Sequence, residues 1–392
     1  MKTNNLLIAA AVALAFVAPT QSFAEYGDDA YKDRVALSKQ IKKMKNMRKQ
    51  LPSPPPSGLF GVYAFPEKGQ YVTGVNFQQH EFDGLLKGSD SVAATSAIIN
   101  NSTGAPNQFG AVPSLKVLPN SAKANVVLPF INYTIDDKIA LVAMAPLIEK
   151  TSNMESFSAD GSQDYSLYDS VGKFTIKSKG LGDVKFGALY KAYNSEDNKH
   201  NVIIDAVLSA PTGSIEEADQ QIAPMTAGSD VAGQFSTKRL GYGMQLGGGT
   251  WDAMVGAAYW GKEDKWGYGA QYLATIPLED ENKNGWRFGD KHELTAWSSY
   301  SWEPTLVSSF RLRAEHQDEL HGLDPVLAAP GLGAQPGNYG GKIIEASVGV
   351  NYMYAPAKNI SIEYITPLSQ DRNGYQLEKE SAIAISWRNA FF

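Results

Sequence analysis

Residues 280–285 read DENKNG, which is the opening of a calcium-binding loop. Such a loop alternates oxygen ligands and needs a bidentate glutamate at its twelfth position. The twelfth position here is Lys291, which cannot ligate a cation. Because Asp, Asn and Gly also favour tight turns, we interpret the segment as a turn and predict no metal site.

The histidines and hydroxyl residues give no local catalytic pattern. Zinc sites need several clustered ligands, but only two of the five histidines lie close together in sequence, and no third ligand stands near them. Nucleophilic hydrolysis needs a serine or threonine beside a base, and the chain has neither a G-x-S-x-G elbow nor a tight His-x-Ser arrangement. We therefore expect no enzyme and no cofactor. An outer-membrane hydrolase whose residues meet only in space remains a third alternative. The histidines are His80, His200, His292, His316 and His321.

Charged side chains recur on one face of several segments whose other face is apolar. If that face lines a lumen, solutes are selected by rings of charge and by constrictions. Both signs of charge occur, so we predict no strong ion selectivity. We predict a constriction at Arg311 and Arg313 with Glu315, which share a face; the alternative is that opposite charges pair across strands and brace the wall. The lumen-facing candidates are Lys185, Lys191, Asp205, Glu293, Arg311, Arg313, Glu315, Glu345, Glu363 and Arg388.

The elements that carry these charges alternate in polarity with a period of two. In residues 182–193, for example, Phe186 and Tyr190 face away from Lys185 and Lys191. Strands of about 10 residues fit a tilted membrane crossing, and Tyr and Trp gather near the strand ends, as interfacial girdles require. A soluble sandwich alternates too, but these two features favour lipid. The same alternation runs through residues 201–210, 306–315, 344–354 and 360–364.

The connections between these segments fall into two lengths. Short turns with long outer loops are typical of outer-membrane barrels, whose strand number is even. About thirteen strand candidates lie between residues 70 and 392, so we predict an all-β, antiparallel transmembrane β-barrel of about 12 strands (10–14). Counting strands back from a periplasmic C-terminus places the long loop 211–238 in the periplasm, where short turns are expected. One of the thirteen candidates is therefore miscounted. The tight turns are 135–138, 302–305 and 355–358; the longer loops are 211–238, 278–290, 318–340 and 368–376.

Residues 1–24 predict export. Lys2 supplies the positive charge of the n-region, and residues 6–17 form an apolar run. Residues 22–24 (SFA) fit the small-x-small cleavage site of a secretory signal peptide. The chain has no cysteine, so neither a disulfide nor a thiolate metal site can form.

Residues 25–50 are predicted to contain a short basic amphipathic helix. Within residues 31–50, eight Lys and Arg stand against Asp33, and Leu37, Ile41 and Met44 follow a helical spacing. The helix could bind an anionic membrane surface, plug the lumen, or dock a periplasmic partner or the cell wall; a solvated tail is the fourth possibility. A Pro-rich linker, residues 51–69, separates it from the barrel of residues 70–392.

Several strings, taken in order, resemble the outer-membrane family named for the meta-pathway of phenol degradation. The resemblance covers about residues 70–392. It implies a β-barrel transporter, in some relatives linked to aromatic catabolism, and carries over no binding residue. The strings are GLGDV (180–184), APTGS (210–214), LGGGTWD (246–252), GVNY (349–352) and TPLSQDRNGYQL (366–377).

The C-terminal strand, residues 383–392, resembles the recognition signal that barrel-assembly machinery reads, although Phe391 rather than Phe392 shares the apolar face. We predict an outer-membrane channel for small, possibly hydrophobic or aromatic solutes, with its N-terminal segment in the periplasm. Outer-membrane lipid and the solute are the expected partners, and nucleic acid is not. The first alternative is a structural barrel whose basic helix anchors a partner or the cell wall. The sequence indicates no oligomeric state.

Overall fold

The computed structural model describes residues 35, 37–39, 56–57, 59, 68–94, 116–157, 170–223, 233–327, 331–355 and 357–391. The chain divides into two compact units, Met1–Lys45 and Asn46–Phe392. In the first unit, Val35 and residues 37–39 are helical, within the predicted basic helix. The predicted signal peptide lies outside the described residues. No helix in the described part of the chain is long and apolar enough to cross a membrane.

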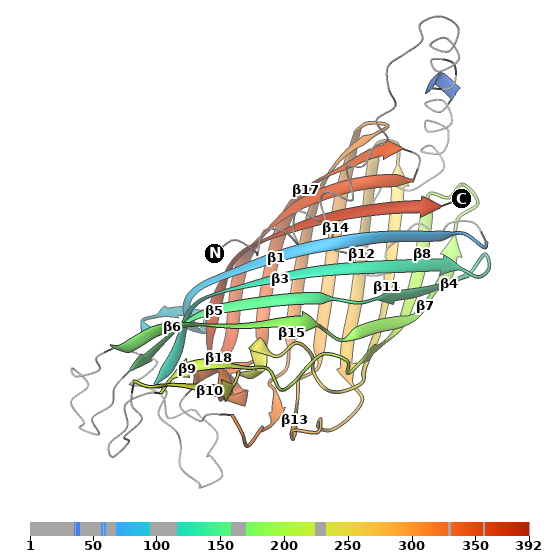
Figure 1. Ribbon diagram of the computed structural model, residues 1–392. Coiled ribbons are helices and arrows are strands. Elements are labelled where there is room, and N and C mark those ends of the chain that lie inside the picture. The colour runs from blue at the N-terminus through green and yellow to red at the C-terminus, as the bar shows by residue number, and fades with distance from the viewer. Residues whose placement is uncertain are drawn as a thin grey trace, which may run out of the picture. The chain divides into compact units, whose positions relative to one another are not determined.

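The second unit is a closed antiparallel β-barrel, as the alternation predicted (Figure 1). Eleven named strands form the ring in the order β1-β18-β17-β15-β14-β12-β11-β8-β7-β4-β3, and pairing of β1 with β3 closes it. The ring strands are β1 (Tyr71–Gly88), β3 (Val117–Thr134), β4 (Ile139–Met144), β7 (Val184–Asn194), β8 (His200–Ala210), β11 (Asp252–Glu263), β12 (Trp266–Pro277), β14 (Lys291–Glu303), β15 (Leu306–Gln317), β17 (Gly341–Ala355) and β18 (Lys358–Phe391).

Strand β18 crosses the barrel wall twice. Its first leg pairs with β17 up to Arg372, and the rest pairs with β1. The two legs contact each other, because Gln370 Nε2 donates to the carbonyl of Lys379 (2.9 Å) and Arg388 Nε donates to Asn359 Oδ1 (3.1 Å). A ring in which every neighbouring pair is antiparallel must contain an even number of crossings. Counting the two legs of β18 separately gives twelve, which is the expected number.

Three further strands extend the wall beyond the closed ring: β2 (Asp90–Val92), β5 (Leu147–Phe157) and β6 (Ser170–Leu181). β5 continues the line of β4 along β3, and β6 continues the line of β7. Pro146 interrupts the first line, since proline supplies no N–H to the ladder. Its carbonyl instead accepts a hydrogen bond from the backbone N–H of Gly182 (2.8 Å), at the matching break between β6 and β7.

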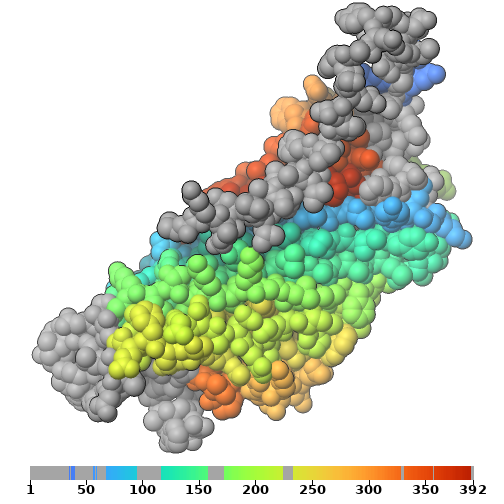
Figure 2. Space-filling model, in the orientation of Figure 1, coloured from blue at the N-terminus to red at the C-terminus, as the bar shows by residue number. Residues whose placement is uncertain are grey.

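The outer face of the wall is apolar and exposed. Along β15, for example, Leu306, Phe310 and Leu312 are exposed, while Val307 and Arg311 are buried. The outward side chains of β1 and β3 form adjoining bands in the space-filling view (Figure 2). Exposed Tyr and Trp include Tyr133, Tyr190, Tyr193, Tyr259, Trp266, Trp302, Tyr352 and Tyr354.

One end of the barrel carries tight turns and the C-terminal strand end. The predicted turns 135–138, 302–305 and 355–358 all lie here, joined by the turns after β7 and β11. Asp136 Oδ1 accepts the backbone N–H groups of Lys138 and Ile139 (both 2.8 Å), and these bonds lower the pKa of the Asp136 carboxyl. We call this the turn end.

The opposite end, which we call the loop end, carries the long connections. The predicted long loop 211–238 lies at this end with the other long connections. Twelve crossings, in place of the thirteen candidates, account for this position. The predicted long loop 368–376 is wrong, because residues up to Arg372 pair with β17, and Arg372 and the residues from Tyr375 onward pair with β1. The reversal is confined to the neighbourhood of Gly374, whose φ is 56°.

A cap of short elements covers the loop end (Figure 1). Tyr242 is fully buried, with its ring centroid 4.8 Å from Trp286 and 5.6 Å from Tyr339. Its hydroxyl accepts the backbone N–H of Asp324 (2.9 Å), and burial raises the pKa of Tyr242 to about 12. The cap elements are β9 (Ala218–Ile222), β10 (Phe235–Arg239), η2 (Tyr242–Met244), β13 (Trp286–Arg287), β16 (His321–Gly322), η3 (Leu332–Ala334) and η4 (Pro336–Asn338).

Three of the strings that carry the family resemblance meet at Asp183, in the break between β6 and β7. Asp183 Oδ1 accepts the N–H of Gly213, and Oδ2 accepts the N–H of Gly248 (both 2.8 Å). A Cβ at Gly247 would lie 2.4 Å from Asp183 Oδ1, so a larger residue there would have to displace the carboxylate that holds these bonds. These strings therefore form one structural junction that fastens the cap to the barrel wall.

Candidate permeation path

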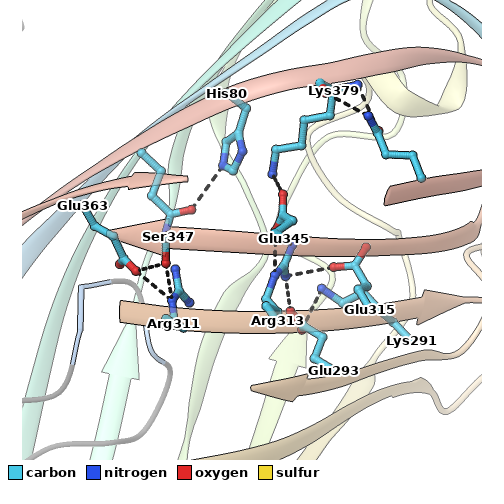
Figure 3. A network of polar contacts seen from close by, with 12 residues as sticks. His80, Lys291, Glu293, Arg311, Arg313, Glu315, Glu345, Ser347, Glu363 and Lys379 are labelled. Atoms are coloured by element: carbon cyan, nitrogen blue, oxygen red, sulfur yellow. Dashed lines mark hydrogen bonds and ion pairs between the residues drawn. The ribbon is translucent and has the colours of Figure 1, made fainter. Parts of the chain in front are cut away.

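Strands β14, β15, β17 and β18 place a ladder of charged side chains on the inner face of the barrel (Figure 3). Arg313 is central to it: Nη1 lies 2.9 Å from Glu315 Oε2, Nη2 lies 2.7 Å from Glu345 Oε2, and Glu293 forms a third ion pair. Lys291 Nζ extends the ladder from Glu293 (3.0 Å), and Lys379 extends it from Glu345.

A second, smaller group lies nearer the turn end. Arg311 Nε donates to Glu363 Oε1 (2.8 Å) and to Ser347 Oγ (3.2 Å), and Ser347 also bonds to Glu363. Arg311 is 6% exposed and Glu363 is 1% exposed. This pair faces the same interior as the ladder but shares no ion pair with it.

The charges of the ladder cancel. Lys291, Arg313 and Lys379 supply three positive charges, and Glu293, Glu315 and Glu345 supply three negative ones. The predicted trio of Arg311, Arg313 and Glu315 is thus divided between two paired groups. Pairing across neighbouring strands is the arrangement expected of a braced wall. A neutral group of charges inside a lumen can also polarise a constriction without selecting one ion sign.

The facing wall carries a continuous apolar cluster among polar side chains such as Gln78, Lys185 and Gln271. This cluster comes from β1, β3, β4, β7, β8, β11 and β12, points inward and includes Phe130, Met144, Met254 and Leu273. These four residues share one cavity of about 430 Å³ with Arg311, Arg313, Glu293 and Glu345. The interior is therefore two-sided, with a charged wall opposite a wall on which a cluster of aliphatic, aromatic and thioether groups lies among polar side chains.

Among the residues that the structure describes, the other predicted lumen residues form no ion pair with the ladder. Lys185 lines the same cavity, and Asp205 is buried with Gln271 Nε2 3.3 Å from its Oδ2. Arg388 bonds to Asn359, as described above. Lys191 is half-buried close to the 135–138 turn, where its backbone N–H donates to the carbonyl of Lys138 (2.7 Å).

Sequence reasoning missed Lys291 and Lys379, although both belong to the ladder. In the sequence, Lys291 stands out only as the failed twelfth position of a calcium loop, and Lys379 follows a segment predicted to be a loop. His80, which the sequence suggests only as a possible metal ligand, lines the cavity, with Nε2 3.2 Å from Gln78 Oε1. The alternation of β1 and of the second leg of β18 was the signal that could have identified His80 and Lys379.

Part of the predicted Pro-rich linker lies inside the barrel. Leu59 is 6% exposed and belongs to a cluster with Ile203, Trp260 and Trp297. Ser57 is also buried, and its hydroxyl donates to Ser361 Oγ (2.6 Å). Because these partners sit on the inner faces of β8, β11, β14 and β18 near the turn end, the segment narrows that half of the interior.

No protein-family model matches the chain, and no characterised protein matches it in sequence. Solved structures do match: an outer-membrane channel of Pseudomonas putida F1 described as COG4313 aligns with a TM-score of 0.54 and 15% identity, covering 86% of this chain and 100% of that one. The chain shares the β-barrel fold of this structure. The P. putida toluene transporter TodX (TM-score 0.41, 12% identity, covering 83% of this chain and 91% of that one) and a P. aeruginosa FadL homologue (0.42, 10%, 87% and 99%) match more distantly.

Proposed function

We propose that the protein is an outer-membrane channel for small solutes with a large hydrophobic or aromatic part. The observation that carries the proposal is the inward-facing apolar cluster around Phe130 and Met254 opposite a charge-neutral ladder. The interior of a water-filled porin is polar on all sides, whereas a wall of this kind gives apolar solutes a surface to bind. The fold shared with an outer-membrane channel is consistent with this role.

The proposal includes the location and assembly of the protein. Residues 25–392 would reside in the outer membrane, with the turn end and the N-terminal segment in the periplasm and with the last strand recognised by the barrel-assembly machinery. Membership of the phenol meta-pathway family remains part of the same proposal, supported by the meeting of three of its strings at Asp183.

The test combines conductance with uptake. Residues 25–392 are reconstituted in planar bilayers, and radiolabelled toluene uptake is measured in cells with a lipopolysaccharide outer membrane, with and without the protein. Discrete conductance steps together with faster uptake are expected. A heat-modifiable, inserted barrel that neither conducts nor speeds uptake would overturn the channel.

The structural anchor is the second candidate, and the buried Ser57 and Leu59 favour it because they fill part of the lumen. Two deletions separate the possibilities. If the Pro-rich segment obstructs an otherwise open path, removing residues 51–66 raises the conductance, whereas removing residues 31–50 does not. Higher conductance only after removal of residues 31–50 would support the basic helix as an electrostatic plug instead. An anchor predicts no conductance in either variant and loss of cell-wall binding without residues 31–50.

The hydrolase has no supporting observation in the described ranges. There, the ring contacts of four histidines are to other groups: His80 contacts Gln78, His200 and His292 contact tyrosines, and His316 contacts Asp318.

A further inference from the structure

The cap at the loop end borders a second, partly open cavity, which shares no lining residue with the two-sided interior. It has a volume of about 310 Å³ and lies between the inner faces of β3, β5 and β6 and the elements β9, β10, η2 and η3. Most of its walls are apolar. Pockets for small organic ligands start at about 300 Å³, so this one has room for a single small molecule. Its apolar lining includes Val117, Met154, Ile176, Ile222 and Leu332.

The charged side chains that line this loop-end cavity are all basic. No aspartate or glutamate lines it among the described residues, whereas Lys238, Arg239 and Arg372 do. Arg239 is already neutralised, since its Nη1 lies 2.7 Å from Asp324 Oδ2 and its Nη2 lies 3.9 Å from Glu216. A solute in the cavity therefore meets positive charge that is not fully compensated.

Among the described residues, Lys238 and Arg372 line the cavity without an ion pair, and Arg372 is the one that also has a buried N–H without an acceptor. Its Nη2 donates to the amide oxygen of Gln370 (3.2 Å), and its buried Nε has no acceptor. In the described part of the chain, no carboxylate lies within 4.0 Å of this guanidinium; Glu315 and Glu345 act on it only from farther away. Arg372 thus stands between the apolar cavity and the charged ladder.

A guanidinium offers a planar pair of donors that fits a carboxylate in two parallel hydrogen bonds, and such charge-assisted bonds are about twice as strong as neutral ones. A buried donor without an acceptor is costly to leave unpaired. A ligand with an anionic head and an apolar body can supply the missing acceptor to Arg372 and also bury its apolar part against the cavity walls.

We propose that the loop-end cavity binds an amphipathic monoanion, with its carboxylate on Arg372 and its hydrocarbon body against Val117, Met154 and Ile176. The proposal rests on the proposed function, because it names the class of solute that the channel would receive from outside. A neutral solute of the same shape would bind through the apolar walls alone, more weakly.

The experiment measures binding of para-butylbenzoate and of uncharged para-butylbenzyl alcohol to residues 25–392 in lipid nanodiscs by titration calorimetry. The expected result is about tenfold tighter binding of the benzoate, the size of one charge-assisted hydrogen bond. Arg372→Gln should bring the two affinities to within about twofold by weakening the benzoate alone. Arg372→Lys, which keeps the charge, should restore part of the preference.

Two controls locate the site. Lys342→Gln removes an exposed cation at the same end of the barrel and should leave both affinities unchanged. Ala122→Trp places a large ring in the cavity and should abolish binding of both probes, with heat modifiability on a gel showing that each variant still folds. Equal wild-type affinities for the two probes, or a benzoate preference that survives Arg372→Gln or Ala122→Trp, would overturn the site.

The outcomes also separate this site from the channel itself. Conductance and toluene uptake without any preference for the benzoate would overturn the site and leave the channel standing. A benzoate preference that depends on Arg372, in a protein that neither conducts nor speeds uptake, would support the site and overturn the channel.

Discussion

Arg313 forms ion pairs with Glu293, Glu315 and Glu345, which come from three different strands. Arg313→Gln would leave the ladder with one uncompensated negative charge. We expect the reversal potential in a salt gradient to shift toward cation preference. We also expect unfolding in urea to become easier by about 3 kcal/mol, the usual cost of removing one partner of a buried ion pair.

A compensating variant separates the two roles of the ladder. Arg313→Gln combined with Glu315→Gln restores a neutral ladder and should return the reversal potential close to that of the wild type, whereas Lys342→Gln should change neither measurement. If Arg313→Gln lowers stability without moving the reversal potential, the ladder braces the wall away from the ion path, and the constriction is elsewhere.

At the junction between β6 and β7, the carboxylate of Asp183 alone accepts the hydrogen bonds from Gly213 and Gly248 that connect the barrel wall to the cap. Asp183→Ala would leave the buried N–H groups of Gly213 and Gly248 without acceptors, at about 1–3 kcal/mol each. Asp183→Asn keeps one carbonyl oxygen and should have a smaller effect. Limited proteolysis within residues 211–251 should become faster in the order wild type, Asn, Ala, while Asp371→Ala, at an exposed carboxylate, should match the wild type. Equal cleavage rates in all four proteins would contradict this role of the junction.

At the scale of the elements, the sequence predicted what depends on local alternation. The two faces of β8 and β15 follow from a period of two, because each side chain points opposite to its neighbour. Pairing partners are not local, and this is where prediction failed. The chain does reverse within the predicted loop 368–376, at Gly374, but residues 368–372 belong to the strand, and their pairing with β17 leaves no mark in composition. Leu59 was equally unpredictable, since one leucine in a Pro-rich segment has no periodicity.

The arrangement of the whole barrel predicts its orientation in the membrane. Short turns gather at one end with the C-terminal strand end, and all the long connections and the cap gather at the other. Outer-membrane barrels place short turns in the periplasm and long loops outside. The loop end, with its cavity and Arg372, should therefore face the cell exterior.

Cysteine labelling tests that orientation directly, because the chain has no cysteine of its own. Lys283→Cys introduces an exposed thiol at the loop end, and Glu196→Cys introduces one in the turn after β7. In intact cells a membrane-impermeant maleimide should label Lys283→Cys and leave Glu196→Cys unmodified, whereas both should react after the outer membrane is permeabilised. Labelling of Glu196→Cys alone in intact cells would mean that the barrel is inverted. The apolar cavity beside Arg372 would then open toward the periplasm and could serve solute release rather than capture.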